Sequence, residues 1–561
     1  MPDRVASNET DFDRRGVVRQ VFESIIILGI SVTLFRTFAA EGYLISTGSM
    51  APSLLGYHKR VECPTCHYTF PRGVPVEDSP ATLNANVHAD PDQVDFLTVD
   101  DFASSRGEFC SCPNCGRHEI SLAAFPKNEG DQLLVHKNVF DVRDPHRWEV
   151  VVFRNPDDPA QPYVKRVVGL PGETIRLLGG DVYAGGQLQR KPLSAQQGVR
   201  IPVDDHAFQP DETDPNWRPR WTAARKDSRW STSPGRMVFQ PDDETAGALD
   251  WIQFRNWITD GGRHTTEVPL LKRSLELPAA ANGLVSFDAN RRRLIAQGAM
   301  PAELRDELLS LNDDVETDKA ILDLFERSHV APITDTYGYN RDDAAAKDFP
   351  VHDLMVEFQV EPSDEGTFVV EMSDDQHTFV CQFQRAENRV SLLVDRETRP
   401  IREATLPKPK DEKERKPLTI EMSVMDRQVL VAVDGQVLFE PLMYAASKES
   451  RPSARSPVRL GASGGDVSIR DLRLYRDVYY TPKHESETRE FVLGPSEFLV
   501  LGDNSPVSVD SRAWDHPAID RSTLIGKPFI VHLPSRQAKI DLLGESRYIR
   551  LPDFSRVRYI R

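Results

Sequence analysis

Two polar residues in this chain could act together as a nucleophile and its base. Ser49 follows a glycine in the segment TGSMAPSL (47–54), and Lys165 opens the segment KRVVGLPGE (165–173). A serine hydroxyl is a weak nucleophile until a neighbouring base removes its proton. A lysine amine can be that base when apolar surroundings lower its pKa toward neutrality, and valines lie on both sides of Lys165. Neither segment contains histidine, so a Ser-His-Asp triad has no candidate here. Taken alone, each segment is a weak signal, because a serine in such a turn is usually only a loop residue and such a lysine is usually a surface charge.

A third polar segment, GDNSPVSVDSR (502–512), follows these two in the chain. In this order the three segments resemble the sequence boxes of bacterial signal peptidase I. The first box, Ser-Gly-Ser-Met-x-Pro-Thr-Leu, is matched with Thr47 in place of the first serine, and Ser46 stands where the family often has proline. The second box, Lys-Arg-x-Val-Gly-Leu-Pro-Gly-Asp, is matched except for Glu173 at its end.

The third box of that family is Gly-Asp-Asn-x-x-x-Ser-x-Asp-Ser-Arg, and residues 502–512 match all its fixed positions. Ile525-Gly526-Lys527 fits the closing strand of the family, and Arg36-Thr37-Phe38 fits the end of its anchor. The resemblance covers about residues 20–60, 130–200 and 490–535, which is less than half of the chain.

The resemblance implies a serine endopeptidase that removes signal peptides from exported preproteins, without a cofactor for catalysis. In that family Ser49 would attack the scissile carbonyl, and Lys165 would take its proton. Four further side chains would support the pair: Thr47 at the oxyanion, Ser508 orienting the Lys165 ammonium, and Asp510 with Arg512 bracing the site. The substrate would bind as an extended strand with small residues such as alanine at the cut.

An apolar run near the N-terminus predicts a membrane anchor. Ile25–Phe35 reads IIILGISVTLF after three arginines, and extending it to 21–40 gives about 20 residues, enough to span a bilayer. The arginines favour a cytoplasmic N-terminus, which would place the catalytic part on the outer, periplasmic or extracytoplasmic, side in contact with membrane lipid. A cleaved signal peptide and a buried core helix are the alternatives, although no clear Ala-x-Ala site follows the run.

Two Cys-x-x-Cys knuckles predict a metal site. CPTC (63–66) and CPNC (112–115) have the spacing with which two thiolates grip one tetrahedral Zn²⁺. The expected ligands of a structural zinc are Cys63, Cys66, Cys112 and Cys115. Two disulfides are the alternative, since the resemblance places this segment in an oxidising compartment, and Cys110 and His67 are spare ligands. Cys381 is expected to be a buried apolar residue.

Short β-rich runs and many turn residues predict a mainly β fold. It would be a membrane-anchored all-β peptidase core with a zinc-ribbon-like insert and an inserted jelly-roll or laminin-G-like β-sandwich at about 350–480. Residues 301–327 carry helical spacing. The predicted order is a cytoplasmic N-terminus (1–20), anchor (21–40), first core part with the nucleophile (41–60), zinc-ribbon-like insert (61–118), second core part with the base (119–190), large insertion (191–488), and third core part with the C-terminal tail (489–561).

Composition excludes some functions and leaves two rivals to the peptidase. A formal net charge of −17 argues against a nucleic-acid partner, because phosphate binding needs clustered basic residues. One rival is a catalytically inactive, membrane-anchored binding or assembly protein, acting through the sandwich on a protein or carbohydrate partner. The other is a self-cleaving repressor with a serine and lysine pair, against which the predicted anchor and the lack of a basic DNA-reading domain count.

Overall fold

The structure is a computed structural model of the 561-residue chain, and its regular secondary structure is mainly β-strand. It describes residues 14–38, 40–74, 109–155, 160–210, 219–241, 247–258, 265–281, 283–312, 314–340, 349–362, 365–395, 397–406, 417–446, 456–483, 489–542 and 545–561. The prediction of a mainly β fold is confirmed. Part of the predicted cysteine-bearing insert, residues 75–108, lies outside the described residues.

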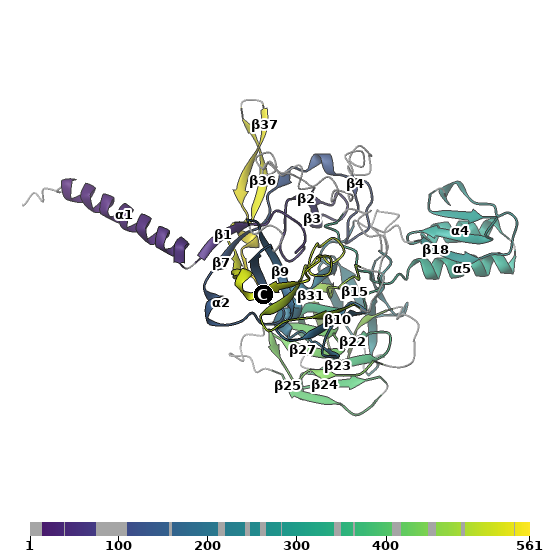
Figure 1. Cartoon of the computed structure of the whole chain (residues 1–561). Coiled ribbons are helices and arrows are strands. Elements are labelled where there is room, and N and C mark those ends of the chain that lie inside the picture. The colour runs from purple at the N-terminus through teal and green to yellow at the C-terminus, as the bar shows by residue number, and fades with distance from the viewer. Residues whose placement is uncertain are drawn as a thin grey trace, which may run out of the picture.

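The N-terminal apolar run forms helix α1 (Arg14–Phe38), which extends away from the rest of the molecule (Figure 1). Its described side chains from Val21 to Ile30 are exposed, and Arg19 pairs with Glu23 at 2.7 Å. Among the described residues, no helix combines the length and the apolar character needed to cross a membrane. The apolar run of the predicted anchor lies within α1, between Glu23 and Arg36.

The predicted core is built on one antiparallel sheet, to which three distant parts of the chain contribute. Its strand order is β1-β7-β35-β8-β9-β33-β34, and β38 pairs with β35. The strands are β1 (Ala40–Leu44), β7 (Gln132–His136), β8 (Val150–Arg154), β9 (Pro162–Gly169), β33 (Glu497–Leu501), β34 (Ala518–Asp520), β35 (Leu524–Val531) and β38 (Arg558–Tyr559). Apolar clusters pack on both of its faces, one around Leu133 and Val152 and the other around Phe153 and Phe498.

Smaller sheets and short helices surround this sheet. One small sheet has the order β12-β11-β10-β32, another β3-β2-β6, and two more are the pairs β4-β5 and β36-β37. Their strands are β2 (His58–Glu62), β3 (Thr69–Gly73), β4 (Phe109–Cys110), β5 (Ile120–Ser121), β6 (Lys127–Asn128), β10 (Thr174–Leu178), β11 (Asp181–Ala184), β12 (Gln187–Leu188), β32 (Glu490–Val492), β36 (Ser535–Leu542) and β37 (Glu545–Pro552). The helices are α2 (Val139–Val142), α3 (Leu193–Val199) and the 3-10 turns η4 (Leu122–Ala124), η7 (Arg521–Thr523) and η8 (Phe554–Arg556).

The large insertion contains two antiparallel sheets that share one apolar core. The first has the order β15-β16-β31-β21-β26-β27-β28, with β13 beside β31 and β29 beside β27, and the second has the order β14-β17-β30-β22-β23-β24-β25. The strands are β13 (Ile201–Asp205), β14 (Trp221–Ala223), β15 (Trp230–Ser233), β16 (Arg236–Phe239), β17 (Asp250–Phe254), β21 (Leu354–Pro362), β22 (Thr367–Ser373), β23 (Thr378–Gln384), β24 (Arg389–Val394), β25 (Arg402–Thr405), β26 (Leu418–Met425), β27 (Gln428–Val433), β28 (Gln436–Val437), β29 (Leu442–Met443), β30 (Val458–Ser463) and β31 (Val467–Arg476). Asp434-Gly435 forms the turn between β27 and β28, with positive φ at both residues.

A small α/β lobe within the insertion projects from the rest of the molecule (Figure 1). Its sheet has the order β18-β20-β19, and two helices pack on it through a separate apolar core. The elements are β18 (Thr265–Pro269), η6 (Ala279–Ala281), β19 (Val285–Asp288), β20 (Arg293–Gln297), α4 (Ala302–Leu311) and α5 (Val315–Ser328). The two helices occupy the segment whose spacing predicted helix. Asp314 caps α5 by accepting a hydrogen bond from the backbone N–H of Thr317.

Candidate active site

Ser49 and Lys165, 116 residues apart in the chain, meet beside the central sheet. Ser49 lies in the loop that follows β1, and Lys165 lies in the middle of β9. The Lys165 Nζ atom is 2.8 Å from the Ser49 Oγ atom and 3.3 Å from the carbonyl oxygen of Val164. These distances allow a proton to pass directly from the hydroxyl to the amine.

The alternation of β9 explains why the lysine is buried. Lys165 lies on the same face of the strand as Tyr163 and Val167, and its partner across the ladder to β8 is Val151. Only 4% of the side chain is exposed, and Nζ lies 5.4 Å from the centre of the Tyr163 ring. Burial disfavours the charged ammonium and lowers the pKa of Lys165 to about 8. About one tenth of the amine is therefore neutral at pH 7, far more than for an exposed lysine.

Thr47 and Ser49 also lie close together. The Thr47 Oγ1 atom is 3.4 Å from Ser49 Oγ, and the Thr47 side chain is exposed. The hydroxyl is thus next to the atom that would attack a carbonyl. Its predicted part in holding the oxyanion stays a prediction.

Asp510 and Arg512 form a buried ion pair in the segment 502–512. Arg512 Nη2 and Nε donate to the two Asp510 carboxylate oxygens at 2.6 and 2.8 Å, and both side chains are at most 2% exposed. Burial raises the pKa of Asp510, but the neighbouring Arg512 guanidinium outweighs this and holds it below its usual value. The same carboxylate accepts the backbone N–H of Gly502, and Arg512 also donates to the carbonyl oxygen of Thr481. The pair therefore ties the two ends of this segment together.

The predicted contact between Ser508 and Lys165 is not formed. Ser508 is buried close to the Asp510 carboxylate, and no hydrogen bond joins its Oγ atom to Lys165 among the described residues. It nevertheless lies near the site, because a side chain at Gly502 would overlap both Ser508 Oγ and the carbonyl oxygen of Ser49. The absence of a side chain at Gly502 thus leaves room for Ser508 to lie this close to the nucleophile segment.

The site includes polar side chains that the sequence analysis did not select. The Asn504 side chain donates to the carbonyl oxygen of Gly48 at 3.0 Å, and its backbone N–H donates to the carbonyl oxygen of Ser49 at 3.0 Å. Arg166, next to Lys165, makes a fully buried bidentate ion pair with Asp503 at 2.7 and 2.8 Å. Asn504 and Asp503 stand at fixed positions of the third box. The sequence could therefore have pointed to these two residues, but it could not have predicted their contacts.

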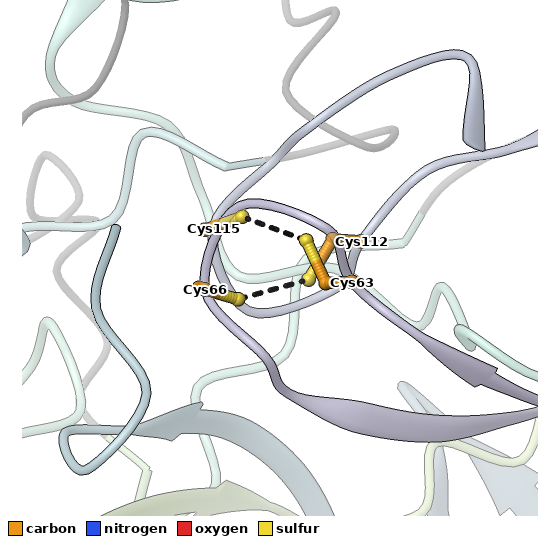
Figure 2. Close-up of side chains that lie close together, drawn as sticks. All are labelled: Cys63, Cys66, Cys112 and Cys115. Carbon is orange, nitrogen blue, oxygen red and sulfur yellow. Dashed lines mark hydrogen bonds between the residues drawn. The ribbon is translucent and has the colours of Figure 1, made fainter. Parts of the chain in front are cut away.

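The four predicted zinc ligands come together in a separate cluster, shown in Figure 2. Their sulfur atoms all lie within 4.8 Å of one another, and the side chains are at most 5% exposed. The Sγ atoms of Cys63 and Cys115 are 3.6 Å apart, and those of Cys66 and Cys112 are 3.7 Å apart. These distances are well beyond the ~2.05 Å of a disulfide bond.

The spare candidates stand outside this cluster. His67 is exposed and lies 3.3 Å from a carboxylate oxygen of Glu62, while Cys110 is buried in β4. Cys381 is fully buried in the core of the two-sheet insertion, as predicted for an apolar role, and burial raises the pKa of its thiol.

Part of the chain is similar to a known protein family. The sequence profile described as signal peptidase, peptidase S26, matches residues 125–228, which contain Lys165 and strands β7, β8 and β9. Within this stretch the chain is similar to the signal peptidase S26 family. Ser49 and the segment 502–512 lie outside the match, so their assignment to the same site rests on the geometry described above.

Signal peptidases from several bacteria are similar to short stretches of the chain. A probable signal peptidase I-2 from Synechocystis is 34% identical over 88 residues, 14% of this chain and 40% of that protein. Signal peptidase I from Pseudomonas fluorescens is 54% identical over 43 residues, 8% of this chain and 15% of that protein. Signal peptidase I V from Bacillus subtilis is 39% identical over 65 residues, 12% of this chain and 38% of that protein. The chain thus spans less than half the length of each of these relatives.

Solved structures also overlap a part of the chain. A Bacillus subtilis protein with a galectin-like fold covers 22% of this chain and 71% of its own, with 11% identity and a TM-score of 0.18. Galectin LEC-6 from Caenorhabditis elegans covers 22% of this chain and 81% of its own, with 14% identity and a TM-score of 0.16. Scores this low carry no inference about a ligand.

Proposed function

We propose that the protein is a signal peptidase of the serine and lysine type, which cuts signal peptides from exported precursor proteins. The observation that carries this proposal is the 2.8 Å contact between Ser49 Oγ and Lys165 Nζ, made by a lysine that is only 4% exposed. The family match around Lys165 supports it. So does the arrangement of the three polar segments at one place beside the sheet.

The geometry supports a two-step acyl transfer. Neutral Lys165 takes the proton of the Ser49 hydroxyl as the oxygen attacks the scissile carbonyl carbon. The oxyanion that forms would be held by the Thr47 hydroxyl and the Ser49 backbone N–H. The C–N bond then breaks, and the proton on Lys165 passes to the leaving amine, which is the new N-terminus of the mature protein. Water, deprotonated by Lys165, hydrolyses the ester and releases the signal peptide.

Substitution of each member of the pair tests this proposal. The purified full chain should cleave a precursor with an Ala-x-Ala signal peptide, and Ser49→Ala or Lys165→Met should lower kcat/KM by at least about 10³-fold. Ser46→Ala is the matched control, because Ser46 is exposed in the same loop. Circular dichroism and thermal unfolding establish that each variant is folded.

Two outcomes would contradict the proposal. Cleavage that survives in Ser49→Ala would assign the nucleophile to another residue. A folded wild type that cleaves no signal-peptide substrate would favour the rival in which the insertion binds a partner and the site is inactive.

A further inference from the structure

The two cysteine knuckles have matching backbone geometry. In each knuckle the residue four positions after the first cysteine donates its N–H to that cysteine's carbonyl oxygen, His67 to Cys63 at 2.9 Å and Gly116 to Cys112 at 3.0 Å. Both donors have a positive φ, 59° and 76°. The knuckles are thus two similar turns. Each turn directs its two thiols toward the space between the two turns (Figure 2).

The spacing of the sulfur atoms fits one tetrahedral zinc ion. With Zn–S bonds of ~2.3 Å, tetrahedral geometry puts the sulfur atoms about 3.8 Å apart. The Cys63–Cys115 and Cys66–Cys112 separations, 3.6 and 3.7 Å, are close to this value, and all four sulfur atoms lie within 4.8 Å of one another. We infer that Cys63, Cys66, Cys112 and Cys115 bind a structural Zn²⁺ as thiolates, each thiol giving up its proton on binding.

The surroundings suit a structural ion and not a catalytic one. Four cysteines fill the coordination shell, so no position is open for water or substrate. The second knuckle is also docked on the large insertion: the Asn114 side chain donates to the carbonyl oxygens of Phe208 at 2.6 Å and Asp205 at 3.2 Å. The buried Arg220 donates to the carbonyl oxygen of Asn114 at 3.4 Å, which brings a positive charge near a site that would carry net negative charge.

Metal analysis of the purified full chain tests the zinc site. We expect one zinc per chain, and a cobalt-substituted protein with the absorption of tetrahedral thiolate ligation. Cys63→Ser and Cys112→Ser should lose most of the metal, whereas Cys110→Ala and Cys381→Ala, which replace buried cysteines outside the cluster, should keep it. A metal-free wild type, iron in place of zinc, or two disulfides in the non-reduced mass would each overturn the inference, and none of these readouts depends on peptidase activity.

A different observation carries a second inference, about residues 337–340 of the insertion (the strap). The strap lies against residues 45–50, which carry the nucleophile (the nucleophile loop). Asn340 and Asn504 form a reciprocal amide pair with both hydrogen bonds at 2.7 Å, and Asn504 in turn holds the carbonyl oxygens of Gly48 and Ser49. Asn340 of the insertion is therefore linked, through the single residue Asn504, to the carbonyl oxygens of both Gly48 and Ser49.

The ring of Tyr339 makes a second contact with the nucleophile loop. It packs on Gly48 and Gly73, where an added Cβ atom would overlap the ring. The Tyr339 hydroxyl donates to the carbonyl oxygen of Tyr57 at 3.0 Å, and the Tyr339 carbonyl oxygen accepts the N–H of Gly73 at 2.8 Å. The ring is thus fixed at both ends, which prevents the loop from moving toward it.

We propose that Asn340 and Tyr339 are positioning residues that hold Ser49 within reach of Lys165. This rests on the proposed peptidase function, because the benefit of a fixed Ser49 is a faster attack on the substrate. The strap is 290 residues from Ser49 in the chain and lies in the insertion. The peptidase site of this chain is therefore completed by a part of the chain that the three sequence boxes do not include.

Kinetics and hydrogen exchange together test the strap. Asn340→Ala should lower kcat about tenfold with KM nearly unchanged, which is the effect expected when one neutral hydrogen-bond pair is lost in positioning. Asn340→Asp, which keeps one acceptor, should fall between Asn340→Ala and the wild type. Asn290→Ala, an exposed asparagine in the small lobe, is the matched control and should change neither parameter.

Hydrogen exchange makes the strap testable even if no substrate is cleaved. In the Ser49→Ala background, Asn340→Ala should speed amide exchange of residues 45–57 severalfold while the melting temperature changes little. Unchanged amide exchange and unchanged kcat in Asn340→Ala would overturn the positioning role that we propose for the strap. Faster exchange in a protein whose wild type is inactive would support the strap and contradict the peptidase.

Discussion

The burial of Lys165 predicts the pH at which the protein becomes active. Because burial lowers the pKa of this lysine to about 8, the neutral amine is about one tenth of the total at pH 7, half at pH 8 and about nine tenths at pH 9. The value of kcat/KM should therefore rise about tenfold from pH 7 to pH 9 and then level off. An exposed lysine with a pKa near 10.4 would instead give a rise of about a hundredfold over the same interval.

A second lysine makes the assignment of this pH profile testable. Burial also lowers the pKa of Lys483 to about 8, and its Nζ donates to the carbonyl oxygen of Pro506 in the third polar segment. Initial rates on a substrate without groups that titrate between pH 6 and 10 should give a midpoint near 8 in both the wild type and Lys483→Gln. A midpoint above 10 in the wild type would refute the argument from burial. Loss of the midpoint in Lys483→Gln would refute the assignment to Lys165.

Further substitutions have expected outcomes in stability. The pKa of Lys165 is lower in the folded protein than in the unfolded chain, so its positive charge opposes folding below pH 8. The variant Lys165→Met should therefore be more stable than the wild type at pH 7, by about 3 kcal/mol in urea unfolding. That difference should shrink as the pH rises from 8 to 10.5, because the wild type then gains stability; a constant difference would contradict the shifted pKa. Lys191, 3% exposed, donates to Asp426 at 2.6 Å and to Asp477 at 2.7 Å, so Lys191→Met should lower stability by about 3–5 kcal/mol by leaving buried carboxylates unpaired, and an unchanged urea midpoint would contradict this. Gly48→Ala should lower activity through overlap with the Tyr339 ring, and adding Tyr339→Leu should restore part of it in the same cleavage assay, whereas no recovery would mean that other neighbours oppose the new side chain.

The sequence indicated the contact of Ser49 with Lys165 and the cysteine cluster, because both depend on residue types in fixed local patterns. The three boxes named Ser49 and Lys165, and valine-rich flanks gave a reason for burial that the structure bears out. The paired Cys-x-x-Cys spacing named the four clustered thiols. The position of Ser508 could not be predicted, because it depends on the close contact of Gly502 with two distant backbone and side-chain atoms.

Contacts between segments that are far apart in the chain could not be predicted from the sequence. Strands β14 to β17 belong to the two sheets of the insertion, although their segment is rich in tryptophan and lacks a clear alternating pattern. Their large residues, Trp221, Trp230 and Phe254 among them, lie in the core that the two sheets share. That core forms only when these strands pack together with the strands of residues 354–476, so the local sequence does not reveal it. Tyr339 and Asn340 carried no signal at all, because an asparagine or a tyrosine in a loop is ordinary until its partners are known.

The strand order of the central sheet also bears on how the protein matures during synthesis. Strand β35 (Leu524–Val531) lies between β7 and β8, and β33 (Glu497–Leu501) lies beside the strand that carries Lys165. The ribosome must therefore add over 350 residues after β8 before this sheet can close. Pairing across such separations is slow, because loop closure costs entropy before the contacts form. A nascent chain thus cannot bring Ser49, Lys165 and the segment 502–512 together until most of its residues have been synthesised.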